Sequence, residues 1–480
     1  MIKKHYLKTL LFSLSILTFS TGCVSPQLSP INAHTLKGDF KAAAIAADKG
    51  KNLKSKLDES NQLPTLYAGN SYLYSKDYKT SLKRLDEAEK IIKFHNEEIL
   101  LGSTGDLIAQ LLLNDSMIDY HASITESIMV NTYKAIDYMA LGDMKNARIE
   151  FNRAIDRQRR AKETYAKIVS KIRKAIKEKE KKVSKENKEN KKDKKTKSQM
   201  LPMDIAKTSN DSNFKNMLDK RYPMLKSYKV YPDFINPFTN YLAGIFFATQ
   251  KDYTKSADIL KEVYGMLPNN KIAKNDFMMV EKILDGKKSK NLNYVWVIYA
   301  NGLSPKKEQF KINAPLFIVT NKISYTGIAL PKMKLQQLAT KDLSLYHNHK
   351  LLGTTKRLAS MDRVVLTEFK YSYNDIVTRA IFSALLKTYV QYEVGKRAGE
   401  YASLAAGFLQ SYLTKADTRI WKNLPKEYQV LKVKMPKSKN LTLNIGSKKI
   451  DLDLRDAKNA IIFVRKPTLT SQVSYSVIKL

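Results

Sequence analysis

The sequence predicts a mostly α-helical chain in which an irregular α-solenoid is followed by a C-terminal α+β domain. In the first part of the 480-residue chain, apolar residues recur at spacings of three and four, as on one face of a helix. Beyond Asp285, short runs of β-branched and aromatic residues lie between turn residues, which is typical of buried strands. Strands, then helices, then strands again favour an α+β domain with its own core.

The first 22 residues have the pattern of a secretion signal peptide. A basic start precedes a short apolar run, and small residues then lead to Cys23, the only cysteine of the chain. The apolar run is too short to be a stable membrane anchor. The segment Ser20–Cys23 resembles a bacterial lipobox, with Ser20 where leucine is usual. The alternative is a small buried cysteine near an ordinary cleavage site.

The lipobox resemblance implies that Cys23 is lipidated and becomes the N-terminus of the mature chain. Acyl chains such as palmitate each add about 0.8 kcal/mol of membrane affinity per buried methylene, so several chains make a stable anchor. In bacteria that resemble enteric species, Asp after the cysteine retains a lipoprotein at the inner membrane, whereas this chain has Val24. The expected location is the outer membrane, facing the periplasm, with residues 23–32 as a tether.

The clearest helical hairpin spans Pro237–Asn270, where the spacing predicts helices over 239–250 and 254–266. Small residues stand where the two helices would touch, larger ones stand beside them, and a proline closes the second helix. These residues are Gly244, Ser256, Phe247, Tyr253, Leu260 and Pro268. The arrangement resembles a tetratricopeptide repeat (TPR), a pattern of about 34 residues. Because one hairpin cannot bury its apolar face alone, further hairpins are expected.

A shorter signature recurs: an acid, an aromatic residue or Met, two spacers and a small residue. It begins at Asp39, Asp77, Asp143 and Asp252. Two further copies carry residues at the TPR packing offsets, namely Gly69, Tyr72 and Leu85, and Ala135, Tyr138 and Phe151. The spacing of the acids is irregular, so residues 33–166 and 214–287 are interpreted as an interrupted TPR-like array. An unrelated helical bundle is the alternative.

Residues 167–213 are rich in lysine and poor in apolar side chains, which predicts that the preceding helix frays into a flexible basic linker. The linker is either a solvated spacer or an arm that lies on anionic lipid headgroups or lipopolysaccharide, where each lysine contributes roughly 1 kcal/mol. The formal net charge is +38. Behind a secretion signal, these envelope polyanions are more accessible than nucleic acid, so no nucleic-acid partner is expected.

The remaining residues, 288–480, are interpreted as the α+β domain. Strands are expected over 292–300, 315–320, 323–330, 428–435, 441–445, 450–454, 460–465 and 473–478. Between them, an amphipathic helix is expected around residues 376–390, and residues 401–413 are apolar nearly all round, as in a buried helix.

Two short motifs have the residue types of ligand sites. His347 and His349 would point to the same side of a strand, as paired metal ligands do, but no cysteine or acidic cluster nearby completes a metal site. A surface loop is therefore favoured. Gly102 and Gly105 lack the Gly-Lys-Ser/Thr sequence of a phosphate loop, so a break between helices is favoured over nucleotide binding.

One carboxylate has the surroundings of a candidate general acid. Glu368 lies near Arg363 and Arg379 in the sequence, and Asp362 or Asp375 is the nearest candidate for the paired carboxylate that glycan cleavage needs. The alternative, an ion pair on a helix surface, is favoured.

Residues 417–421 place a charged pair, Asp417 and Arg419, before Trp421 at a transition from helix to strand. A functional corner is one interpretation of this segment. A corner that caps a helix and packs against the last strands is favoured. No catalytic residue, cofactor or metal site is therefore predicted.

Four phrases in the C-terminal half resemble a family of uncharacterised bacterial lipoproteins that carry TPR-like repeats. They are NGLSPKKEQFKINAP, YTGIALPK, TRAIFSALLKTYVQY and ADTRIWKNLP. Members of that family are often linked with cell-envelope and peptidoglycan assembly. The resemblance implies a non-enzymatic, lipid-anchored scaffold that binds envelope proteins, such as a peptidoglycan synthase or another lipoprotein, through its helical array. The alternatives are an envelope enzyme acting on peptidoglycan and a lipoprotein that binds anionic surfaces.

Overall fold

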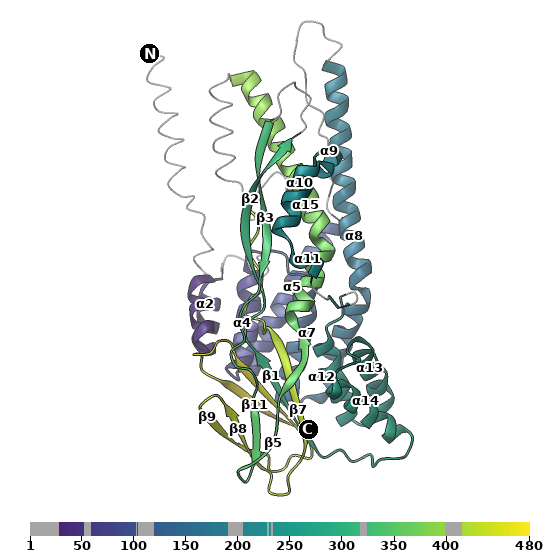
Figure 1. The fold of residues 1–480 in the computed structure, drawn as a ribbon, viewed down its shortest axis with the longest axis vertical. Helices are drawn as coiled ribbons and strands as arrows, with labels where there is room; N and C mark the ends of the chain where they lie inside the picture. The colour runs from purple at the N-terminus through teal and green to yellow at the C-terminus, as the bar shows by residue number, and fades with distance from the viewer. Residues whose placement is uncertain are drawn as a thin grey trace.

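The structure is a computed structural model that describes residues 28–51, 59–101, 103, 120–190, 205–227, 230–231, 234–316, 324–398 and 415–480. An N-terminal region of packed helices is followed by a C-terminal region of mixed helix and sheet (Figure 1). Within these ranges, no helix is long and apolar enough to cross a membrane. Cys23, Gly102, Gly105 and the helix expected over 401–413 lie outside the described residues.

The N-terminal helices pack one on the next as hairpins. The elements are α2 (Leu28–Lys37), α3 (Phe40–Lys49), η2 (Glu59–Asn61), α4 (Gln62–Tyr74), α5 (Tyr78–Leu101), α7 (Ile124–Ala140), α8 (Met144–Asn190), α12 (Pro237–Thr249), α13 (Tyr253–Met266) and α14 (Lys271–Leu284). The two helices expected from the hairpin at 237–270 correspond to α12 and α13.

One turn geometry joins the two helices of each hairpin, and it explains the recurring acid. The residue before each acid has a positive φ of 62° to 79°; these residues are Gly38, Lys76, Gly142 and Lys251. The backbone N–H of each acid then donates to the carbonyl five residues earlier, at 2.8 to 3.0 Å. This is the Schellman pattern, which satisfies the last carbonyls of a helix. Asp39, Asp77 and Asp143 also accept a hydrogen bond from the N–H three residues ahead and so cap the next helix.

Two hairpins share a further contact where their helices touch. A Cβ atom on Gly69 would lie 2.5 Å from Leu85, and one on Gly244 would lie 2.6 Å from Leu260. The Ser81 hydroxyl lies 2.9 Å from the Gly69 carbonyl oxygen, and the Ser256 hydroxyl donates to the Gly244 carbonyl at 2.7 Å. Glycine is therefore needed at both positions because the partner helix lies against its backbone.

The C-terminal region contains a five-stranded sheet and a four-stranded sheet. The first has the order β11 (Ser474–Lys479), β10 (Ala460–Lys466), β1 (Tyr294–Asn301), β7 (Glu427–Lys434), β6 (Lys356–Ser360), with only the β1–β10 pair parallel. The second has the order β5 (Lys350–Thr354), β4 (Ser344–His347), β8 (Asn440–Ile445), β9 (Lys448–Asp453). Strands β4, β5 and β6 were not predicted because each is only four or five residues long. The strand expected over 315–320 overlaps only the end of β2 (Lys306–Leu316), whose first residues are charged or polar.

The five-stranded sheet is covered on both faces, which explains why β1 and β10 are buried along almost their whole length. Trp296 and Ile298 of β1 belong to a core shared with the helical hairpins. Val295, Val297 and Tyr299 point the other way, into a core shared with the four-stranded sheet. The molecule therefore has three layers: helices, central sheet and outer sheet. The expectation that the α+β domain has its own core is wrong on the helical side, because helices and sheet bury one another.

A second core supports an arm that extends from these layers (Figure 1). The arm consists of the second half of α8, α9 (Ile205–Asn210), α10 (Ser212–Arg221), α11 (Met224–Ser227), α15 (Met361–Ala398) and the ribbon β2 (Lys306–Leu316) and β3 (Ser324–Lys334). Residues 167–190, expected to fray into a linker, are helical. Two tertiary contacts hold this stretch: Ile172 and Ile176 lie one turn apart and pack in the second core, and Arg173 forms an ion pair with Asp375 of α15 at 2.7 Å.

Candidate functional site

The catalytic candidate Glu368 has a structural role. Its two carboxylate oxygens accept hydrogen bonds from the backbone N–H groups of Ile124 and Thr125, at 2.7 and 3.0 Å. These are the first residues of α7, where a helix has unpaired N–H donors and favours a negative charge. Glu368 therefore ties α15 to the start of α7. The sequence did not predict this backbone contact; the Arg363 guanidinium nearby lies 3.9 Å from the centroid of the Tyr231 ring.

The other candidate carboxylates are engaged elsewhere. Asp362 forms a close ion pair with Lys426. Asp375 accepts from Tyr165 at 3.0 Å and pairs with Arg173. Glu368, Asp362 and Asp375 all lie on α15, and each binds a different neighbouring segment. The structure does not bring them together in one cleft.

His347 and His349 lie at the β4–β5 hairpin, far from Glu368 in the fold. Asn348 and His349 have φ values of 48° and 62°, as a two-residue hairpin turn with both central residues in the left-handed region requires. His347 Nδ1 is 3.0 Å from the carbonyl oxygen of Asn440, whereas His349 lines a groove described below. The described residues include no group of three or more His, Cys, Asp or Glu side chains that would hold a metal ion.

The segment Asp417–Trp421 runs from a partly exposed start to a buried end that packs against the helical hairpins. Asp417 pairs with Arg419 at 2.8 Å. Trp421 is fully buried, and its backbone N–H donates to the Glu126 carboxylate of α7 at 2.7 Å. Its indole ring packs edge-on against Tyr133. The segment is thus a packing corner, and its partners are the helices as well as the last strands.

This corner continues into a strip, residues 415–431, that fills the inner face of the helical array. Tyr67 of α4 accepts from the Lys422 N–H, and the Asn70 and Asn423 amides bond each other at 2.8 and 3.0 Å. On α12, the Phe238 ring stacks on Tyr428 with a centroid distance of 3.3 Å. Helices α4, α7 and α12 are consequently buried nearly all round. Helices α4 and α12 contain no charged residue, which was a sequence signal of this arrangement, whereas α7 carries Glu126, Lys134 and Asp137.

The Glu126 carboxylate holds this strip to α7. It accepts hydrogen bonds from the Tyr120 hydroxyl and from the N–H groups of Ser123 and Trp421. Burial raises the pKa of Glu126, while these three donors lower it. The side chain is fully enclosed, so it serves as an internal clasp.

A buried charge cluster joins α5, α7 and α8. The Lys134 ammonium lies 2.7 Å from Asp86, 2.7 Å from Glu89 and 3.0 Å from Glu150. Burial opposes the charge on Lys134, but the surrounding carboxylates raise its pKa overall. Every charge in this cluster has a partner inside it, so the cluster holds the hairpins together.

The residues predicted to pack the TPR-like hairpins differ in exposure. Gly69, Ala135, Gly244, Phe247, Tyr253 and Ser256 are buried, Tyr72 and Tyr138 are partly buried, and Pro268 lies in the turn after α13. The Tyr72 hydroxyl donates to Asp48 of α3 at 2.8 Å. Phe247 is covered by the cationic groups of Arg148 and Lys255. Pro268 is exposed, whereas Tyr72 and Tyr138 are only partly accessible.

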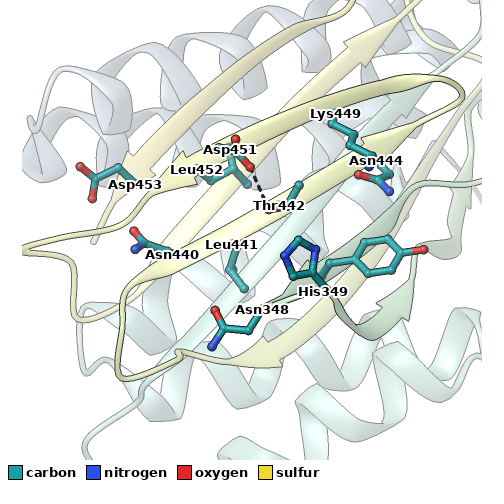
Figure 2. A pocket seen from close by; sticks show the side chains of 11 residues that line it. Asn348, His349, Asn440, Leu441, Thr442, Asn444, Lys449, Asp451, Leu452 and Asp453 are labelled. Carbon is teal, nitrogen blue, oxygen red and sulfur yellow. Dashed lines mark hydrogen bonds between the residues drawn. The ribbon is translucent and has the colours of Figure 1, made fainter.

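An open groove of about 800 Å³ lies on the outer face of the four-stranded sheet (Figure 2). Its side chains follow from the strand register. Asn440, Thr442 and Asn444 alternate along β8 with Leu441, Leu443 and Ile445, which belong to the core. Opposite them on β9 stand Asp453, Asp451 and Lys449. Tyr346 of β4 pairs with Thr442 on the other side.

Two carboxylates of the groove are held in place. The Thr442 hydroxyl donates to Asp451 at 2.8 Å (Figure 2). Arg455 donates to Asp453 from its side chain and backbone, and these bonds lower the pKa of Asp453 to about 2. Both acids come from the same exposed strand. The groove thus combines anionic acceptors, amides, a hydroxyl and one lysine on a rigid sheet.

Comparison with known proteins gives no independent assignment. Neither a protein-family model nor a curated protein matches the chain. The resemblance to TPR-bearing lipoproteins stays a prediction, and the function is argued from the geometry.

Proposed function

We propose that this protein is a lipid-anchored, non-enzymatic scaffold of the bacterial cell envelope, built on an irregular TPR-like array. The observation that carries the proposal is the repeated hairpin: one Schellman turn, one acid position and, in two hairpins, one serine-to-glycine contact recur along the helices. Repeats of this kind stack into extended surfaces that bind other chains. The partner class is a peptidoglycan synthase or another envelope lipoprotein.

The filled inner face limits where such a partner binds. Residues 415–431 already occupy the side that α4, α7 and α12 share. The outward surfaces of α3, α5, α8 and α13 remain, and they include the exposed side chains of Ile45 and Ile149. A partner protein is therefore expected on the outer side of the array. The exposed lysines Lys174, Lys177 and Lys181 of α8 offer a contact for anionic lipid or lipopolysaccharide.

The roles of the candidate acids support a non-enzymatic function. General acid catalysis in glycan cleavage needs two carboxylates flanking one bond. Here Glu368 caps α7, Asp362 pairs with Lys426 and Asp375 pairs with Arg173. Each acid has a structural partner, and the three lie in separate contacts.

Photo-crosslinking in intact cells tests the scaffold. A crosslinking amino acid is placed at Ile45 or Ile149, which are exposed on the outward surfaces of α3 and α8, and at Phe238 on the filled inner face as the matched control. The first two variants are expected to capture a small set of envelope proteins, whereas Phe238 is expected to give only crosslinks within the chain. The proposal fails if no envelope protein is captured from the accessible positions. It also fails if the purified protein releases fragments from isolated peptidoglycan and Glu368→Gln abolishes the release.

The lipid anchor is tested by Cys23→Ala. The variant is expected to lose acyl labelling and to move from the membrane pellet to the soluble or unprocessed fraction. A variant that still pellets with outer membranes after a high-salt wash would show that another feature anchors the chain.

A further inference from the structure

We infer that the groove on the outer face of the four-stranded sheet is a binding site for a neutral, hydroxyl-rich glycan. The groove is separate from the surface assigned to a partner protein, because it lies on the sheet layer farthest from the helical hairpins. Its side chains are presented by β4, β8 and β9, which pair along their length and rest on a core of Leu443, Ile445 and Ile450. The site is thus already formed before a ligand arrives, which lowers the entropy cost of binding.

The hydrogen-bonding groups match sugar hydroxyls. Each hydroxyl of a sugar both donates and accepts, so it pairs with side chains of either kind. The floor offers the amide of Asn440, which does both, together with the side chains of Thr442 and Asn444. Asp451 and Asp453 add acceptors along one wall, and hydrogen bonds to Thr442 and Arg455 hold them in position. A glycan therefore finds both donors and acceptors along the same groove.

The opposite wall is aromatic. Tyr346 projects from β4 beside Thr442, and His349 follows at the hairpin turn. In Figure 2 the His349 imidazole lies beside the floor of the groove. Flat rings with a polar edge offer an apolar face to the C–H groups of a sugar ring and keep the polar edge in water.

The lining disfavours the other common ligand classes. Phosphate groups are bound by clusters of arginine and lysine, whereas this groove combines one lysine, Lys449, with two carboxylates. An acyl chain needs an apolar lining, but the aliphatic side chains here, Leu441 and Leu452, are almost fully buried in the core below. A peptide that adds to a sheet binds along the outer side of an edge strand, whereas this groove lies over the face of the sheet, on β8 and the strands paired with it.

The size of the groove fits an oligosaccharide better than a folded protein. A volume of 800 Å³ lies within the range of small-molecule sites, roughly 300–1,000 Å³. A stable protein partner would bury about 800 Å² on each side, over some 20–30 residues. A few sugar units along the β8–β9 hairpin are therefore the expected occupant.

Calorimetric titration of the purified full-length mature protein tests the inference. The probes are the tetrasaccharides of β-1,4-glucose, α-1,4-glucose and β-1,4-N-acetylglucosamine, with tetralysine and inorganic phosphate as competing classes. At least one tetrasaccharide is expected to bind. Tyr346→Ala and Asp451→Ala are each expected to weaken its affinity by roughly tenfold or more, equivalent to about 1.4 kcal/mol.

Matched controls separate the groove from general surface effects. Asp258→Ala removes an exposed acid from α13, and Tyr371→Ala removes an exposed tyrosine from α15; both are expected to bind as the wild type does. Thr442→Val, which keeps the shape of the floor, replaces any groove variant whose melting temperature falls. The inference is overturned if no tetrasaccharide binds, if groove and control variants bind alike, or if tetralysine or phosphate binds more tightly than every sugar. Crosslinking in cells does not depend on this site, so the scaffold proposal fails or survives separately.

Discussion

At the residue scale, the recurring acid of the hairpins has a defined geometric role. It follows a residue with positive φ, closes the preceding helix through its N–H and, in three hairpins, caps the next helix through its carboxylate. In the fourth hairpin, Asp252 instead pairs with Arg148 of the neighbouring hairpin at 2.6 Å. Lys76 and Lys251 occupy the left-handed position without being glycine, which shows that the surrounding turn determines it.

Gly244→Ala is expected to destabilise the protein by about 1–3 kcal/mol, because the new Cβ would lie 2.6 Å from Leu260 Cγ in a filled contact. Gly265→Ala on α13 is the control, since no atom lies within 4 Å of the Cβ position there. It is expected to stabilise by roughly 0.4–1 kcal/mol by restricting the unfolded chain. Urea denaturation measures both. Equal stabilities for the two variants would contradict the assigned contact between α12 and α13.

The Asp362 carboxyl is expected to make the unfolding free energy depend on pH. Burial raises its pKa from the ordinary 3.8 to about 6, although Lys426 lowers it. Between these two values the folded chain binds the proton more tightly than the unfolded chain does, so the contribution of Asp362 to the unfolding free energy falls as pH rises. Asp362→Asn is expected to remove this slope. Denaturation curves measured across the window test it, and parallel pH profiles for wild type and variant would refute the assignment.

At the element scale, the strip formed by residues 415–431 decides how helices and sheets are joined. Its backbone and side chains bond α4 and α7, and it then continues into β7. The same strip contains Asn423, whose carbonyl oxygen accepts from the buried guanidinium of Arg465 at 3.1 Å. One segment thus supplies hydrogen bonds to polar groups of both layers.

The Asn70–Asn423 pair tests this junction in a double-mutant cycle. Both amides are buried and bond each other reciprocally. Either single alanine variant leaves one buried amide unpaired and is expected to cost about 1–3 kcal/mol. The double variant is expected to cost less than the sum of the two by roughly 1 kcal/mol. Strictly additive losses would mean that the amides do not depend on each other.

At the whole-molecule scale, the hairpins and the five-stranded sheet share one core. That core includes Leu66 and Tyr133 from the helices, and Trp296, Trp421 and Phe463 from the C-terminal region. A boundary near residue 287 therefore separates two kinds of secondary structure but crosses a continuous apolar interior. Neither part buries its apolar face without the other.

The helical region and the C-terminal region are consequently expected to unfold together. Both tryptophans are fully buried in the common core, so tryptophan fluorescence reports on the sheet layer and the strip. Far-UV circular dichroism reports mainly on the helices. The two signals are expected to follow the same urea transition. Two well-separated midpoints would show that the regions have independent cores.

Much of the fold was predictable because its determinants are close together in the sequence. The turn acids, the small residues at helix contacts and the long apolar strands β1, β7 and β10 all depend on neighbours within one hairpin or strand. Residues 167–213 were predicted to extend the preceding helix before fraying into a linker, and α8 extends to Asn190. Two isoleucines, Ile172 and Ile176, stand there at a helical spacing within a polar composition. Lysine, glutamate and alanine are good helix formers, so a few buried contacts are enough to order such a segment.

The sequence by itself determined the repeated hairpins, the change to strands and the expectation of a lipidated Cys23, because each follows from local spacing. Only the tertiary structure decided what fills the array and where the open groove lies. Tyr67 and Lys422, which share a hydrogen bond, are 355 positions apart. In the groove, β4 lies beside β8, and the contact between His347 and Asn440 joins residues 93 positions apart. Such contacts depend on which apolar and polar surfaces find each other once the layers have formed, and no local pattern contains that information.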